Sequence, residues 1–139
     1  MKKTNEKSVI RSLLDLPMPE PEVSTVRVPR LGLEIVLREL PYGKLAALRG
    51  TEDANINYLL SSIQEPDPKD PLWFREKMKC ATPVDALKKL LKGGEIQGLV
   101  RRCDILNGYA PDSVVAVDRD EKDLQNEAVG AALEELEKN

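Results

Sequence analysis

Few side chains in this sequence could carry out acid–base or metal chemistry, and their spacing suits none of the common reactions. Histidine is absent from all 139 residues, which excludes triads that use imidazole as the base and the usual zinc sites. The carboxylates follow helix-surface patterns and do not lie in apolar surroundings that would shift a pKa. We therefore expect no catalytic residue, no bound metal and no cofactor, so that the protein is not an enzyme.

Two local patterns resemble ion or phosphate sites but lack essential residues. The acidic run at residues 118–123 has neither the glycine nor the downstream glutamate of a calcium-binding loop. Gly93 and Gly94 match no phosphate-loop pattern, and they are read as the junction between two helices. Cys80 and Cys103 do not have the spacing of a metal or redox motif, which favours free thiols in a reducing compartment.

Charge is divided unevenly along the chain. Residues 69–102 carry nine basic and four acidic side chains, a net +5, whereas residues 118–139 carry eight acidic and three basic ones, a net −5. The two segments could bind each other or different partners, or they could be solvated helix faces. Because the whole chain has a net charge of −3 and no aromatic residue lies close to Lys88 and Lys89, we expect protein contacts there and no nucleic acid.

The first element that could position such contacts is a helical arm. Residues 8–16 have an amphipathic pattern that includes Leu13 and Leu14, and prolines at 17, 19 and 21 prevent the helix from continuing. Alternating hydrophobic residues then predict a β-hairpin with one buried face: Val26 and Val28 precede a turn at residues 29–32, and a second strand runs from Leu33 to Leu37.

The chain after Pro41 predicts a mostly helical body, so the fold class is α+β. Thr82 supplies an N-cap hydroxyl before Pro83 and Asp85, which marks the clearest helix start, and Gly93 ends that helix. The other elements expected are helices over residues 42–49, 53–64, 70–79, 94–106 and 124–137, and a strand over residues 113–117. We expect three parts: an arm and Pro-rich linker (1–22), a core (23–110) and an acidic extension (111–139).

Candidate partner-binding residues are the apolar and basic side chains that these elements need not bury. Trp73 and Phe74 are adjacent, so on a helix they point about 100° apart; one could be a binding anchor, or both could wedge between helices. The arm and the C-terminal amphipathic helix carry narrow apolar stripes that suit a partner or self-association. The full set is Leu13, Leu14, Trp73, Phe74, Lys88, Lys89, Leu133 and Leu136.

No apolar run is long enough to cross a membrane, and the N-terminus lacks the apolar stretch of a secretory signal. We therefore expect a cytoplasmic protein without a membrane contact.

A resemblance to a known family rests on four short motifs in residues 23–109. These are Glu65-Pro66, Ala81-Thr82-Pro83, Leu90-Leu91-Lys92-Gly93-Gly94-Glu95-Ile96 and Leu106-Asn107-Gly108-Tyr109. Their order after a hairpin resembles the tail assembly chaperones of long-tailed phages and defective prophages of Gram-positive bacteria. The resemblance implies a protein of the host cytoplasm that binds the tape measure protein, keeps it soluble and helps tail tube subunits polymerise around it.

The family resemblance also implies a programmed frameshift near the end of the gene, which would yield a longer form with a second domain. The last residues, Glu137-Lys138-Asn139, can be encoded by a slippery heptamer. Two other functions remain open: a structural head–tail adaptor or completion protein, and a small bacterial regulatory module.

Overall fold

The computed structural model describes residues 10–117. The chain divides into two units, Met1–Tyr109 and Ala110–Asn139, and every helix and strand described below belongs to the first. The expected helix over residues 124–137, with Leu133 and Leu136, lies outside the described residues.

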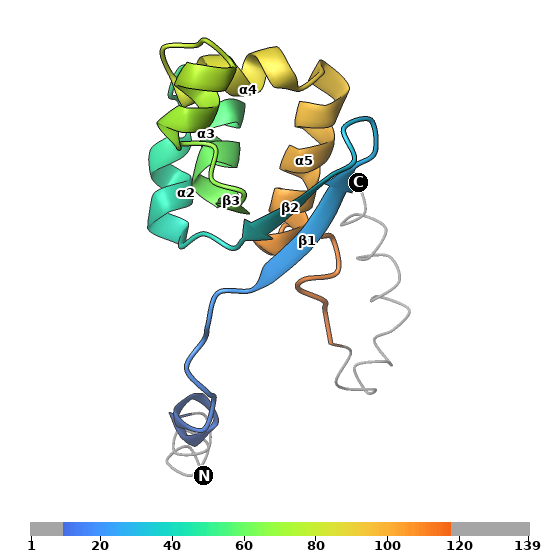
Figure 1. Ribbon diagram of the computed structural model, residues 1–139. Coiled ribbons are helices and arrows are strands. Elements are labelled where there is room, and N and C mark those ends of the chain that lie inside the picture. The colour runs from blue at the N-terminus through green and yellow to red at the C-terminus, as the bar shows by residue number, and fades with distance from the viewer. Residues whose placement is uncertain (1–9, 118–139) are drawn as a thin grey trace, which may run out of the picture. The chain divides into compact units, whose positions relative to one another are not determined.

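A three-stranded antiparallel sheet forms the β part of the fold. The predicted hairpin is confirmed as β1 (Val23–Val28) and β2 (Leu33–Arg38), with Val28 opposite Leu33. Gly32, at φ 62°, supplies the left-handed conformation that the connecting turn needs. A short strand that was not expected, β3 (Ile63–Glu65), pairs with the other side of β2, so the order is β1-β2-β3 (Figure 1).

The sheet has one buried face, as the alternation in the sequence predicts. Val28 and Ile35 are 4% exposed and Leu37 is fully buried, whereas Glu34 and Arg38 are exposed. The period of two in a strand places the first three side chains on one face and the last two on the other. The buried face must therefore be covered by other elements.

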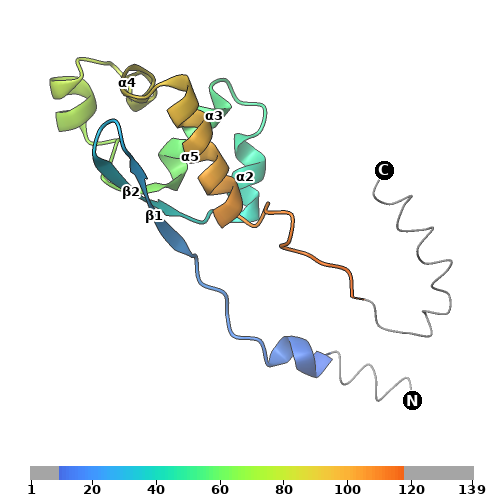
Figure 2. The same ribbon diagram turned by 90° about the vertical axis from the view of Figure 1, so that its right-hand side faces the viewer.

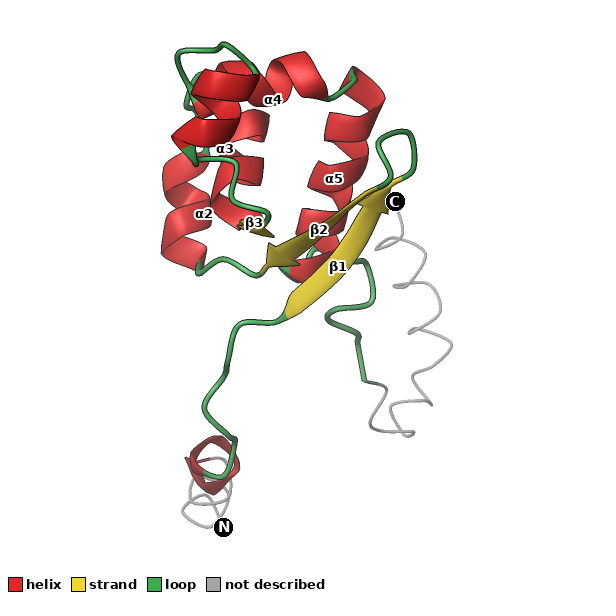
Figure 3. Cartoon of the chain, in the orientation of Figure 1, coloured by secondary structure: helices red, strands yellow, loops and turns green. Residues whose placement is uncertain are grey.

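The helical body provides that cover. It consists of α2 (Tyr42–Leu48), α3 (Ala54–Ser62), the π-helix η1 (Leu72–Lys77), α4 (Pro83–Leu90) and α5 (Gly93–Leu106) (Figure 3). Leu59 of α3 and Cys103 of α5 are fully buried and join Leu37 of β2 in one hydrophobic cluster. α5 lies alongside the hairpin in both Figure 1 and Figure 2. The α+β fold is thus confirmed.

Three local predictions are wrong. Gly93 does not end a helix: α4 ends at Leu90, and Gly93 is the first residue of α5. The helix expected over residues 70–79 is a shorter π-helix, in which the Met78 N–H donates to the Trp73 carbonyl at 2.9 Å. Residues 113–117 form no strand in this chain.

No helix within residues 10–117 is long and apolar enough to cross a membrane.

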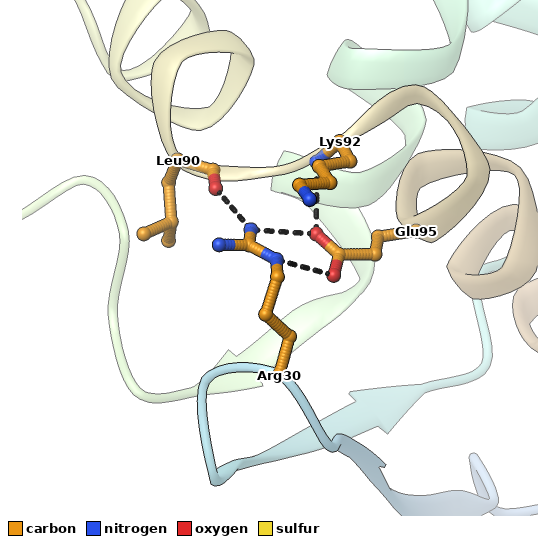
Figure 4. A network of polar contacts seen from close by, with 4 residues as sticks. All are labelled: Arg30, Leu90, Lys92 and Glu95. Carbon is orange, nitrogen blue, oxygen red and sulfur yellow. Dashed lines mark hydrogen bonds and ion pairs between the residues drawn. The ribbon is translucent and has the colours of Figure 1, made fainter.

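A network of hydrogen bonds holds the hairpin turn against the start of α5 (Figure 4). The Arg30 guanidinium donates to both carboxylate oxygens of Glu95, at 2.8 Å each, and to the Leu90 carbonyl at 2.8 Å. The same carboxylate accepts the Lys92 N–H at 2.8 Å, which satisfies a free donor at the helix start. Gly93 and Gly94 therefore lie within a capped helix start that is held in place by a residue from the hairpin.

The hydrogen bond from Arg30, followed by that from the Lys92 N–H, lowers the pKa of Glu95 to about 2. In the unfolded chain a glutamate titrates near its ordinary pKa of about 4.3. The ionised Glu95 carboxylate therefore contributes its full stabilisation of the fold when the pH is above its pKa in the unfolded chain. That contribution is lost as the pH falls through its pKa in the folded protein.

We predict that replacing Thr82 with alanine will lower the free energy of unfolding by ~1 kcal/mol. The Thr82 hydroxyl accepts the Asp85 N–H at 3.1 Å and caps α4, and alanine leaves that donor without its partner. Chemical denaturation measures the loss. Thr82→Ser keeps the oxygen and should remain close to wild type; an equal loss in both variants would contradict the capping role.

We also predict a pH dependence that is due to Glu95. Between about pH 5 and about pH 2, the urea midpoint of the wild-type chain should fall more steeply than that of Glu95→Gln, which has no proton to take up. Glu76→Gln is the control, because Glu76 is exposed on η1 and makes no ion pair with another described residue. If the urea midpoints of the wild-type chain and of Glu95→Gln fall in parallel with pH, the contact between Glu95 and Arg30 contributes nothing to the pH dependence of stability.

Candidate protein-binding groove

An open apolar groove of about 660 Å³ lies where the sheet, α4 and η1 meet. We call it the Trp73 groove. Its apolar walls are formed by Leu33, Ile35, Ile63, Trp73, Leu87, Leu90 and Leu91, and Asp67, Asp70, Leu72 and Lys77 line it as well. A largely apolar concave surface with a few charged groups is typical of a binding site.

Three parts of the fold build this groove together with η1. β2 and β3 contribute Ile35 and Ile63, which also belong to the core. α4 contributes Leu87 and Leu90, because its apolar residues recur at helical spacing. The Pro-rich segment 66–71 closes another side, since its prolines cannot continue either a helix or a strand.

η1 places the two adjacent aromatic side chains in different surroundings. Phe74 is 6% exposed and belongs to the core, with the Arg75 guanidinium 5.3 Å from its ring centroid. Trp73 is only partly buried: it packs against the hydrophobic cluster and lines the groove. Of the two residues, Trp73 is therefore the one available to a partner. Leu72, beside it, is 72% exposed.

Hydrogen bonds to the main chain fix the two aspartates at the groove. The Asp70 carboxylate accepts the Leu72 N–H, and the Asp67 carboxylate accepts the Lys69 N–H, both at 3.0 Å. These bonds stabilise the turn that leads into η1. The aspartates therefore place negative charge beside an apolar surface.

Lys88 and Lys89 of α4 do not line the Trp73 groove. The Lys88 ammonium lies 2.9 Å from the Asp53 carboxylate, and this hydrogen bond raises the pKa of Lys88 above its ordinary value. Lys89 donates to the Met78 carbonyl at 3.0 Å. Both side chains thus make contacts within the chain, although exposed contacts of this kind contribute little to stability.

The arm exposes its apolar stripe. Residues 10–14 form a helical turn, on which Leu13 is 66% and Leu14 76% exposed. Met18, in the Pro-rich linker, is 85% exposed. The part of the chain that the structure describes therefore does not cover these side chains.

A second, smaller cavity of about 350 Å³ is lined by Tyr58 and Asp104, which belong to a polar network. The Tyr58 hydroxyl donates to the Asp104 carboxylate at 2.8 Å and accepts the Asn107 amide at 2.9 Å; the Asn107 oxygen accepts the Leu40 N–H at 2.8 Å. Burial and the bond to Asp104 raise the pKa of Tyr58 above its ordinary value, so the phenol stays protonated. The network joins α3, α5 and the segment after β2.

Two further observations concern the reactive side chains of the described residues. Burial raises the pKa of the Cys103 thiol to about 11, which keeps it protonated and poorly nucleophilic at neutral pH. Residues 10–117 contain no group of three or more Cys, Asp or Glu side chains placed to hold a metal ion.

The sequence predicted Trp73 as a candidate contact, and Trp73 lines the groove; the sequence did not predict Leu72 or the structural role of Asn107. The groove is lined by β3, segment 66–71, η1 and α4 together, and no local sequence pattern predicts that these parts of the chain meet. Asn107 was recognised only as a helix stop, since its partners Tyr58 and Leu40 are distant in sequence.

Comparison with known proteins gives a likeness of fold. No family model matches the sequence, and no curated protein matches it. The crystal structure of the protein YqbN, a structural-genomics target, superposes with a TM-score of 0.54 at 18% sequence identity. The match covers 67% of this chain and 90% of YqbN. The chain therefore shares the fold of YqbN over that region.

Proposed function

We propose that this protein is a phage or prophage tail assembly chaperone that binds an apolar helical segment of the tape measure protein, without catalysis. The observation that carries the proposal is the open Trp73 groove, whose apolar walls and partly buried tryptophan suit a protein ligand. The family comes from the four sequence motifs described above.

Binding of a helix in a groove is the recognition mode that fits this surface. An amphipathic helix can lay its apolar stripe along Leu72, Leu90 and Trp73, which are exposed or only partly buried, so that both surfaces leave water. Aromatic residues at the centre of an interface commonly supply much of the affinity. A long helical client whose stripe is covered in this way stays soluble, which is the task of a chaperone.

Charges at the groove favour a particular class of client helix. Asp67 and Asp70 lie on the same segment, and Lys77 is at the other end of η1. A helix with basic residues beside one end of its apolar stripe would complement the two aspartates. Such pairs increase specificity more than affinity.

The arm provides a second apolar contact in this proposal. Leu13 and Leu14 are exposed on a helical turn that three prolines separate from the sheet. An arm on a stiff linker can bind a second segment of the same client and raise the overall affinity through effective concentration. The tail tube protein is also a proposed partner, and no surface is assigned to it. The proposal further includes the longer form that a frameshift would produce.

A structural head–tail component would be retained in the particle, whereas an assembly chaperone would be absent. Mass spectrometry of purified virions distinguishes these roles. Detection of this chain in stoichiometric amounts would contradict the chaperone assignment.

We predict that Leu72→Asp will weaken binding of a synthetic amphipathic helix from the tape measure protein about tenfold, the equivalent of ~1.4 kcal/mol. Leu72 is 72% exposed, so the substitution should barely change the melting temperature while placing a charge at the groove. Isothermal titration calorimetry measures the affinity.

The matched control is Tyr42→Asp, because Tyr42 is also 72% exposed and lies on α2, away from the groove. This variant should bind the peptide like the wild-type chain. Equal affinity for Leu72→Asp and wild type would refute the assignment of the client to the Trp73 groove.

A further inference from the structure

A second groove follows the outer edge of the sheet. β1 is an edge strand, and within the described residues its outer backbone edge pairs with no other strand. A groove of about 750 Å³ runs between residues 24–29 and α5; we call it the β1–α5 groove. Figure 2 shows β1 at the sheet edge with α5 beside it. An open edge of this kind is a template for an added strand.

The β1–α5 groove is basic. It is lined by Arg27 of β1 and by Arg101 and Arg102 of α5, none of which forms an ion pair with another described residue. The one acidic side chain in the lining, Glu95, is already bound to Arg30. An occupant should therefore be extended, to pair with the strand edge, and acidic, to satisfy the arginines.

One segment of this chain has those properties. Residues 112–118 read Asp-Ser-Val-Val-Ala-Val-Asp, a β-branched run between two acids. Val114, Val115 and Val117 are 87%, 66% and 72% exposed, although the sequence predicts a strand there. Five residues of strand span roughly 17 Å, which fits within the six residues of β1. The remainder of the chain, residues 118–139, adds a net charge of −5.

We propose that residues 113–117 of a second copy of this chain add as a fourth strand to the outer edge of β1. The added strand buries valine side chains in the β1–α5 groove, and its flanking acids lie near Arg27, Arg101 and Arg102. Reciprocal exchange gives a two-fold dimer in which each copy donates one strand and accepts one. This inference uses a different surface from the Trp73 groove and does not depend on the proposed function.

Gly98 offers a way to block the groove without disturbing the fold. It lies within α5 and lines the β1–α5 groove, and a Cβ built there meets no atom within 4 Å. A leucine at this position therefore projects into the groove, and it also favours the helix more than glycine does.

The experiment measures the mass of the full chain by analytical ultracentrifugation over a range of concentrations. The wild-type chain should form a dimer that dissociates as salt is added, because the contact includes exposed charges. Gly98→Leu, which fills the groove, and Val115→Pro, which disrupts the donated strand, should each raise the dimer dissociation constant at least tenfold. Neither should lower the melting temperature of the monomer.

The control is Gly43→Leu, because Gly43 lies in α2 and its Cβ position is equally open. This variant should form dimers like the wild-type chain. Hydrogen exchange at dimer-forming concentration provides a direct readout: amides of residues 113–117 should be protected in the wild-type chain and exposed in Gly98→Leu.

Three results would overturn the proposal. The first is a wild-type chain that stays monomeric at every concentration, and the second is a dimer that neither Gly98→Leu nor Val115→Pro weakens. The third is a dimer weakened by Gly98→Leu alone, which would mean that the groove binds a segment other than the valines.

Discussion

The fold depends on burying one face of a very small sheet. The apolar face of the three short strands includes Leu37 and Ile35, which are buried, and a sheet of this size has no stability of its own without a packed face. Leu59 from α3 and Cys103 from α5 complete the cluster against that surface. With only five aromatic residues in the chain, aliphatic side chains must fill most of the core. α4 joins the same cluster through Leu87, and the bond between Arg30 and Glu95 fixes where the hairpin turn meets α5.

Local patterns in the sequence were sufficient to predict much of this fold. The alternation of Val28, Ile35 and Leu37 gave the hairpin and its buried face, because a period of two places such residues on one side. Thr82 marked the start of α4, and Asn107 marked the end of α5. These signals work because each depends on residues close to one another in the chain.

The features that sequence reasoning missed depend on contacts between distant residues. β3 has three residues and no alternation of its own, and it is a strand only because β2 lies beside it. Gly93 reads as a helix stop, yet Glu95 and Arg30 make it a helix start. In the candidate site, Trp73 stood out by its residue type, whereas the groove around it is lined by segment 66–71, η1 and α4, which are separated in the sequence. The charge of Lys88 was visible, but its bond to Asp53 was not.

The position of Trp73 has an optical consequence. It is the only tryptophan in the chain, it is partly exposed, and it lines one groove and not the other. Indole emission shifts to shorter wavelength when water leaves its surroundings. Docking of an apolar helix beside Trp73 therefore shifts the fluorescence emission maximum of the wild-type protein to shorter wavelength. An event confined to the β1–α5 groove leaves that emission unchanged. The native sequence thus contains a probe that distinguishes the two surfaces without any label.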